Sequence, residues 1–357
     1  MKIIALLLLI TLSFNGGLTA YGQGSLTPPG PPAATMRTLA QVESRTPIAS
    51  APYVISAPGA YYLAANLIVD GGNAITIATN QVSLDLMGFT IRSTAPVASG
   101  YGIKLASGVS DIQIINGHIR GSVTNNSNGV YSGGGFRHGV SFTNEEPRRV
   151  AVKKVTVSGV QADGINIGFS SSAEFCLVDR AGGQGITAAT VNNSAATECG
   201  LAAITATTAS GAMGTSFESH GIWSHNLSNS SGFSTNHTGI YGGVIENCYG
   251  TSGGALPGIE SFSSVDGCYG TSAQGSGIVT INAMNSRGEG GGLYGLQAKT
   301  AQNCSGLGGH TGLQCARTAT GCSGQGNSIG LSAFIADTCT GFSTGTSLSV
   351  THTINSF

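Results

Sequence analysis

The sequence predicts an all-β protein that folds as a single-stranded parallel β-helix of about twelve coils. Three observations predict it: a short internal repeat, a composition dominated by small residues, and short runs of alternating apolar and polar residues. The pentapeptide Cys248–Ser252 returns letter for letter as Cys268–Ser272. The 357 residues include 56 Gly, and only 9% of them are charged. A steady short period is the mark of a repeat architecture.

The repeat is a Gly followed by an aliphatic residue. From Gly185 onward its spacing stays close to 18 residues, whereas longer spacings before Gly185 indicate inserted loops. Ala203-Ile204 fills one gap in the series. The other pairs are Gly102-Ile103, Gly139-Val140, Gly164-Ile165, Gly185-Ile186, Gly221-Ile222, Gly239-Ile240, Gly258-Ile259, Gly277-Ile278, Gly295-Leu296, Gly312-Leu313 and Gly330-Leu331.

The composition of each unit indicates strands and not helices. Helical repeats are longer and need strong helix formers, whereas these units are rich in Gly, Ser, Thr and Asn. Alternating runs such as residues 74–77, 82–86 and 111–114 carry the period of two that is typical of strands. We expect each aliphatic residue to point inward and each Gly to let the backbone turn where a side chain would clash. Twelve coils at about 4.8 Å would form a rod of roughly 55 to 60 Å.

Two segments precede the repeats. Residues 1–23 resemble a signal peptide, with Lys2 followed by an apolar run of about 12 residues, too short for a bilayer that needs about 20. Residues 24–50 hold five of the ten prolines and indicate a lead-in or linker. We therefore expect a β-helix domain over 51–357, secreted to the periplasm, cell surface or medium, without a transmembrane segment after cleavage.

Charge limits the partners. The formal net charge is −1, and residues after 180 carry three Lys and Arg against seven Asp and Glu. Nucleic-acid binding draws on clustered cations, so a nucleic-acid partner is not expected. We expect the protein to be a monomer. Its expected partner is a polysaccharide or a cell-surface glycan.

Five of the eight cysteines recur at the repeat spacing. An exported chain with eight cysteines raises the possibility of disulfides. Side chains in a parallel ladder point the same way, however, which favours a column of free, buried thiols. No His shares this column, and no metal site is predicted. The column consists of Cys248, Cys268, Cys304, Cys322 and Cys339, with Ser286 in the missing coil.

Three segments resemble a known group: LTPPGPPAATMRTLAQVESRTPI, PGAYYLAANLIV and VSLDLMGFTI. With the repeat, the chain resembles the secreted right-handed parallel β-helix proteins of environmental bacteria, which are similar in fold to pectin lyases. The resemblance implies the right-handed sense and a capped N-terminal coil near residues 52 to 70. It implies no activity.

One group of residues has a catalytic pattern. His138 and Asp163 each stand directly before the Gly of their coil, so they should be neighbours on stacked coils, with Arg137 beside them. An acid that orients a His, with an Arg nearby, could abstract a proton from a uronate. The alternative is that both are turn residues. Hydrolysis is disfavoured because no paired carboxylates recur on one face, and Glu145-Glu146 are neighbours that would face opposite ways.

A second group has a binding pattern. Trp223, Tyr241 and Glu260 each stand two positions after the Gly of successive coils, so they should point outward in a column. An exposed Trp and Tyr would form a platform for sugar rings, unless a loop covers both. Arg148 and Arg149 lead a basic cluster that could hold an acidic polysaccharide or form a solvated loop.

The sequence thus supports two hypotheses. The first is a non-catalytic carbohydrate-binding or extracellular structural protein. The alternative is a carbohydrate-active enzyme, a polysaccharide lyase or a related enzyme, that acts on an acidic polysaccharide near residues 120 to 180. No cofactor is expected, except that a lyase could use calcium. The insertion at residues 120 to 139 could form one wall of its cleft.

Overall fold

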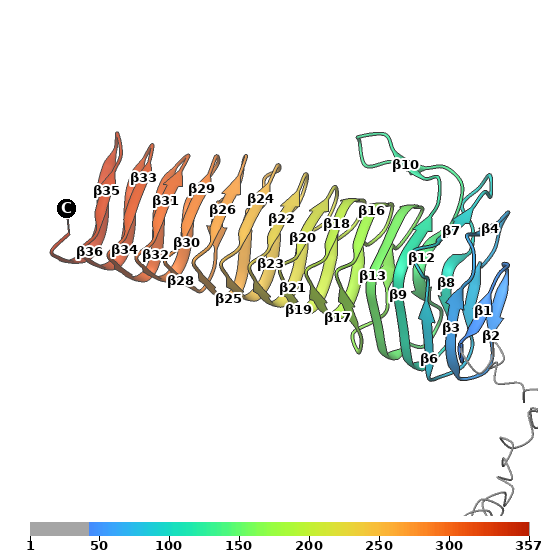
Figure 1. The fold of residues 1–357 in the computed structure, drawn as a ribbon. Coiled ribbons are helices and arrows are strands. Elements are labelled where there is room, and N and C mark those ends of the chain that lie inside the picture. The colour runs from blue at the N-terminus through green and yellow to red at the C-terminus, as the bar shows by residue number, and fades with distance from the viewer. Residues whose placement is uncertain (1–42, 357) are drawn as a thin grey trace, which may run out of the picture. The chain divides into compact units, whose positions relative to one another are not determined.

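A computed structural model describes residues 43–356 and confirms the predicted class. The chain from Arg45 onward is an all-β parallel β-helix, in which successive coils stack as in Figure 1. Every described strand pair is parallel except the small hairpin of β10 (Thr124–Asn125) and β11 (Tyr131–Ser132). The predicted signal peptide and most of the lead-in lie outside the described residues. Residues 43–356 contain no helix that is long and apolar enough to cross a membrane.

The strands form three parallel ladders that the chain visits in turn. The first ladder holds β2 (Tyr53–Ile55), β5 (Ile75–Ile77), β8 (Tyr101–Leu105), β12 (His138–Phe142), β14 (Ile165–Asn166) and β27 (Ile278–Val279), and the N-terminal parts of β17 (Ile186–Asn192), β19 (Ile204–Ser210), β21 (Ile222–Ser228), β23 (Ile240–Glu246), β25 (Ile259–Asp266), β30 (Tyr294–Gln302), β32 (Thr311–Thr320), β34 (Ile329–Asp337) and β36 (Thr346–Ile354).

The second ladder continues from the C-terminal parts of those long strands. It also holds β1 (Thr46–Ile48), β3 (Gly59–Leu63), β6 (Val82–Asp85), β15 (Ser172–Glu174), β28 (Asn282–Met284), and the N-terminal parts of β9 (Ser110–Arg120) and β13 (Arg148–Val160).

The third ladder takes the C-terminal parts of β9 and β13. Its other members are β4 (Leu67–Val69), β7 (Thr90–Ser93), β16 (Leu177–Ala181), β18 (Ala195–Cys199), β20 (Met213–Ser216), β22 (Ser231–Ser234), β24 (Tyr249–Ser252), β26 (Tyr269–Ser272), β29 (Arg287–Gly290), β31 (Ser305–Gly308), β33 (Ser323–Gly326) and β35 (Thr340–Phe342).

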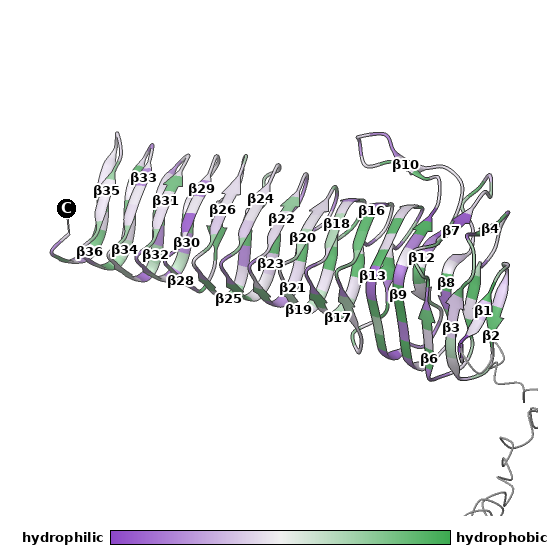
Figure 2. Cartoon of the chain, in the orientation of Figure 1, coloured by the Kyte–Doolittle hydropathy of each residue, from purple (hydrophilic) through white to green (hydrophobic). Residues whose placement is uncertain are grey.

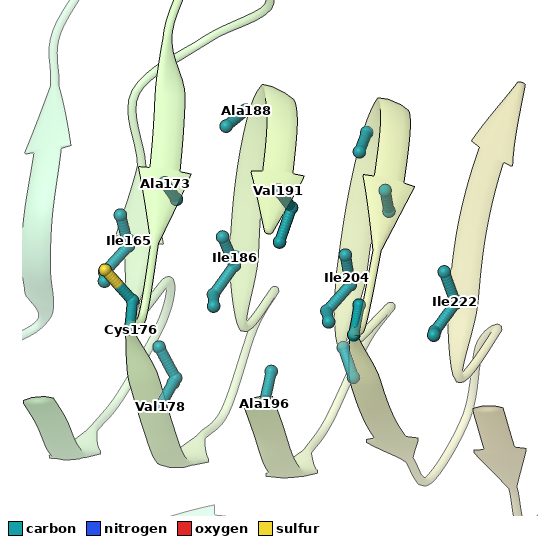
Figure 3. Close-up of a cluster of buried hydrophobic side chains, with 14 of the residues drawn as sticks. Ile165, Ala173, Cys176, Val178, Ile186, Ala188, Val191, Ala196, Ile204 and Ile222 are labelled. Atoms are coloured by element: carbon teal, nitrogen blue, oxygen red, sulfur yellow. The ribbon is translucent and has the colours of Figure 1, made fainter. Parts of the chain in front are cut away.

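The repeat predicted from the sequence is the inward column of the first ladder. Its aliphatic side chains, such as Ile165, Ile186 and Ile204, are register partners and fully buried, and Figure 3 shows them on successive coils. The first ladder has fifteen strands and not twelve, because the column also includes Tyr53, Ile75 and Leu348. None of these three follows a Gly, so the Gly-aliphatic pattern misses them.

The interior narrows toward the C-terminus. In the third ladder the inward residue is Ile119 on β9 and Val178 on β16, but Gly250 on β24. A Cβ on Gly250 would lie 2.4 Å from Ile259 Cγ1 and 2.5 Å from Gly258 O, so the first and third ladders touch through their backbones. The hydropathy colours agree, since β9 and β13 carry strong apolar colour while β33 and β35 are pale (Figure 2).

Close packing also explains the Gly before each aliphatic residue. Gly239 lacks a positive φ, and a Cβ there would lie 2.4 Å from Thr251 N. The expected clash of a side chain is therefore confirmed at this position, whereas the expected turn does not require a positive φ there. Residues with a positive φ recur at the corner between the second and third ladders, for example Asn229 and Asn247.

The cysteine column follows this corner. All eight cysteines are buried and free in the structure. Cys248 N donates a hydrogen bond to Cys268 Sγ at 3.3 Å, and Cys268 N donates one to Ser286 Oγ at 3.1 Å. A thiol and a hydroxyl can occupy the same column, because Cys268 Sγ and Ser286 Oγ each accept an N–H from the neighbouring coil. This is the ladder of free thiols that the spacing predicts.

The N-terminal coils contain the segment expected to form a cap. β2, β3 and β4 run through residues 52 to 70 as ordinary stacked strands, and β1, inside the predicted lead-in, pairs with β3. The solenoid therefore starts a few residues before position 51.

Candidate functional site

His138 and Asp163 meet where the third ladder turns into the first. His138 begins β12, and its Nδ1 lies 3.5 Å from Asp163 Oδ2 on the next coil. The imidazole stacks on Tyr101 of the preceding coil, with ring centroids 4.8 Å apart and an angle of 11°. The predicted contact between His138 and Asp163 is present in the structure. Tyr101 was missed, although it stands directly before Gly102 as His138 stands before Gly139.

Asp163 stays ionised in this corner. Burial acts to raise the pKa of its carboxyl, but His138 and a hydrogen bond from Gln184 N at 3.1 Å outweigh burial and lower that pKa. A carboxylate facing Nδ1 favours the imidazole tautomer with a proton on Nδ1 and leaves Nε2 as the acceptor. Nδ1 of His138 is buried without a hydrogen-bond partner, so the ring is held by stacking on Tyr101 and by its 3.5 Å contact with the Asp163 carboxylate.

Two cations flank this corner. Lys104 Nζ lies 5.7 Å from the centre of the Tyr101 ring. Arg137 is exposed, and its backbone N–H donates to Gly100 O at 3.1 Å. The structure shows no side-chain contact between Arg137 and either member of the pair. A base beside cations has the elements needed for proton abstraction next to a carboxylate.

Trp223, Tyr241 and Glu260 form the predicted outward column. Trp223 on β21 is the register partner of Tyr241 on β23, which in turn partners Glu260 on β25. Their inward neighbours Ile222 and Ile240 are fully buried, whereas both rings are only half-buried. The described residues place no loop over these rings that buries them fully, so the platform is accessible.

Other rings brace this platform. His225 contacts Trp223 edge-on with centroids 5.0 Å apart, and Phe262 lies 6.0 Å from Tyr241 and 6.1 Å from His225. His220 lies 5.1 Å from Tyr241. We call Trp223, Tyr241, His225, Phe262 and His220 the aromatic platform.

The imidazole of His220 is neutral at physiological pH. Burial and the neighbouring His237, whose ring centroid is 4.3 Å away, lower the pKa of His220 to about 4. An uncharged ring adds apolar and hydrogen-bonding surface to the platform without adding charge.

The corner that holds His138 and Asp163 and the aromatic platform both lie along the first ladder. Four coil steps separate β12 from β21, or about 19 Å at the usual strand spacing. In both places a residue before the Gly contacts an outward residue of the first ladder: His220 contacts Tyr241, and Tyr101 contacts Lys104. The two kinds of position therefore belong to one surface. A long polymer lying along the first ladder would reach both.

The predicted basic cluster is largely neutralised. Arg149 forms two hydrogen bonds with Asp111, at 2.6 and 2.8 Å, and these lower the pKa of Asp111 to about 2. Lys153 Nζ lies 2.7 Å from Glu174 Oε2. Arg148 lines a hollow of about 690 Å³ together with Glu145 and Glu146. Acidic and basic groups mix here, as expected of a solvated loop.

Sequence reasoning missed a third group, Arg92 and Arg120. They are register partners on β7 and β9 and line a cavity of about 480 Å³ on the third ladder. Residues 120–124 of the predicted insertion line this cavity, whereas its last residues, Arg137 and His138, belong to the His138 corner. The signal was present as Ile91-Arg92 and Ile119-Arg120, an inward Ile followed by an Arg on consecutive coils. Residues 43–356 hold no group of three or more His, Cys, Asp or Glu that could bind a metal.

Comparisons with known proteins add little beyond the fold. No family model matches the chain, and no curated protein matches it. Among solved structures, the A-module of Azotobacter vinelandii mannuronan C-5 epimerase AlgE4 is similar at 12% identity and TM-score 0.38, over 83% of this chain and 90% of that one. The AlgE6 A-module is similar at 13% identity and TM-score 0.36, over 84% and 90%. No residue role is transferred from either.

Proposed function

We propose that this is an exported β-helix protein that binds a polysaccharide along the outer surface of the first ladder. The observation that carries the proposal is the aromatic platform, in which Trp223 and Tyr241 lie in register on neighbouring strands and remain half-exposed. Natural monomers seldom leave a Trp and a Tyr side by side on a flat sheet without a partner for their ring faces.

The shape of the platform favours sugars. Flat aromatic rings pair with the apolar faces of sugar rings, while polar groups at the rim bind the hydroxyls. Glu260, beside Tyr241, supplies a carboxylate acceptor, and His220 and His225 supply ring nitrogens. The rings are held by each other, so little side-chain freedom remains to be lost on binding.

The test is a binding panel of neutral and acidic polysaccharides with purified mature protein. We expect Trp223→Ala and Tyr241→Ala each to weaken binding by about tenfold or more, because truncation of a central aromatic contact has this order of effect. Phe233→Ala is the matched control, since Phe233 is a 38% exposed aromatic on the third ladder. Equal binding by all three variants would contradict the proposal.

A second function is favoured by the corner of Tyr101, His138 and Asp163. An ionised Asp163 facing His138, with Lys104 nearby, would suit abstraction of the proton beside a uronate carboxylate. Elimination of the glycosidic oxygen would then give an unsaturated sugar at the new chain end, whereas return of a proton to the opposite face would invert the configuration at that carbon. The test incubates acidic polysaccharides with the protein, with and without calcium, and follows both products. Activity lost in His138→Ala and in Asp163→Asn would establish an enzyme, and an inactive wild type would exclude this function for the substrates tested.

A further inference from the structure

The third ladder carries a groove under the β10–β11 hairpin. One hollow of about 480 Å³ is lined by Arg92, Arg120 and Arg180, and an adjoining hollow of about 470 Å³ shares Arg120 and Arg180 with it. Both hollows also share Thr90 and Ser158. The two form one elongated groove on a different ladder from the aromatic platform.

The charge of this groove is unbalanced. Arg180 is paired with Asp179, with nitrogen–oxygen distances of 2.7 and 2.9 Å. Arg92 and Arg120 have neither an ion pair nor a side-chain hydrogen bond among residues 43–356. No other two cations of the described chain are register partners. Both side chains are exposed and lie opposite each other on parallel strands, so while the groove is empty they repel each other weakly through water.

The hairpin makes the groove a fixed site. Tyr131 Oη donates to Glu198 O at 2.7 Å, and Gln161 Nε2 donates to Tyr131 O at 3.0 Å. These bonds tie the hairpin to coils far along the chain. Thr124, on the same hairpin, also lines the groove. The wall is therefore held in place before a ligand arrives.

We propose that this groove binds an oxyanion, a carboxylate or sulfate carried by a hydroxyl-rich chain, between the guanidinium groups of Arg92 and Arg120. Two adjacent guanidiniums offer parallel N–H donors that match the two oxygens of such a group. Thr90 and Ser158, which line the same hollows, supply hydroxyls for the rest of the chain. This site is independent of the aromatic platform and distinguishes acidic from neutral chains.

The experiment measures binding of polygalacturonate, dextran sulfate and uncharged dextran, with inorganic phosphate as a small-ion competitor. The variants are Arg92→Gln and Arg120→Gln. The control is Arg317→Gln, which makes the same change of charge at an exposed position on β32, a strand that belongs to the first and second ladders. We expect about tenfold weaker binding of one acidic polymer for each groove variant, the loss of one charge-assisted contact, and no change for Arg317→Gln. The polymer affected identifies the carboxylate or the sulfate.

The unfolding temperature of the groove variants shows whether the two arginines bind a ligand or stabilise the fold. Without ligand, Arg92→Gln should be as stable as the wild type or more stable, because it removes the repulsion. A structural role would lower its unfolding temperature. Equal loss of binding in all three variants, or competition by phosphate with no difference among variants, would overturn the proposal. Trp223→Ala should keep binding at the groove, so failure of the platform and failure of the groove give different results.

Discussion

The thin C-terminal interior predicts that Gly250→Ala will destabilise the solenoid although it adds a single methyl group. The added Cβ would lie 2.4 Å from Ile259 Cγ1 and 2.5 Å from Gly258 O. The side-chain atom can move, but the carbonyl cannot move freely because it accepts the hydrogen bond of Ile240 N at 3.0 Å. Relief of the overlap therefore strains the first ladder.

The magnitude follows from two costs and one gain. Overpacking a close-packed interior costs about 1 to 3 kcal/mol, and a weakened ladder hydrogen bond adds about 1 kcal/mol. The loss of chain freedom in the unfolded state returns about 0.4 to 1 kcal/mol. We expect a net loss of about 2 kcal/mol, or a fall of several degrees in the unfolding temperature.

The assay is thermal and urea unfolding followed by circular dichroism, together with hydrogen exchange at the coils around Gly250. Gly71→Ala is the matched control, because the nearest atom to its added Cβ is Ser99 Oγ at 3.7 Å and its φ is not positive. It should be neutral or slightly stabilising. If Gly250→Ala unfolds like Gly71→Ala, the backbone contact between the ladders is refuted.

Three further predictions concern titratable groups. Because all eight thiols are buried, they should stay unreactive toward a disulfide reagent until the protein unfolds, when eight react; early reaction would contradict the buried column. Because the folded pKa of His220, about 4, lies below its ordinary 6.5, the unfolded state takes up the proton first. Its stabilising contribution is full above pH 6.5 and is lost as the pH falls toward 4, so His220→Gln should flatten the stability profile in that window in urea titrations. Arg149→Gln should raise the pKa of Asp111 from about 2 toward 3.8 in an NMR titration, and an unchanged value would rule out their ion pair.

The sequence predicted what is periodic. The aliphatic column, the outward position of Trp223 and Tyr241, and the contact of His138 with Asp163 all follow from counting residues relative to one Gly in each coil. The N-terminal coils broke this count, because Tyr53 and Ile75 do not follow a Gly. Only coils in which the inward aliphatic residue follows a Gly could therefore be counted from the sequence.

What the sequence could not predict depends on contacts between distant segments. The hairpin position rests on the Tyr131 hydrogen bond to Glu198, 67 residues away, and no local pattern encodes such a contact. The hairpin side of the groove was missed for the same reason, although the Ile-Arg pair that repeats on its two strands is visible in the sequence. The narrowing of the interior was missed because Gly in a strand suggests a turn, whereas here it permits backbone contact between ladders.

The most direct test of polysaccharide binding along the first ladder uses the single Trp of the chain as its own reporter. Trp223 is the only tryptophan, so its emission reports on the platform without labelling. We predict that titration with a bound polysaccharide shifts or quenches this emission with a saturable dependence, and that Tyr241→Ala weakens the response. Polysaccharide binding that leaves the emission of Trp223 unchanged, or the absence of any response across the panel, would contradict the account.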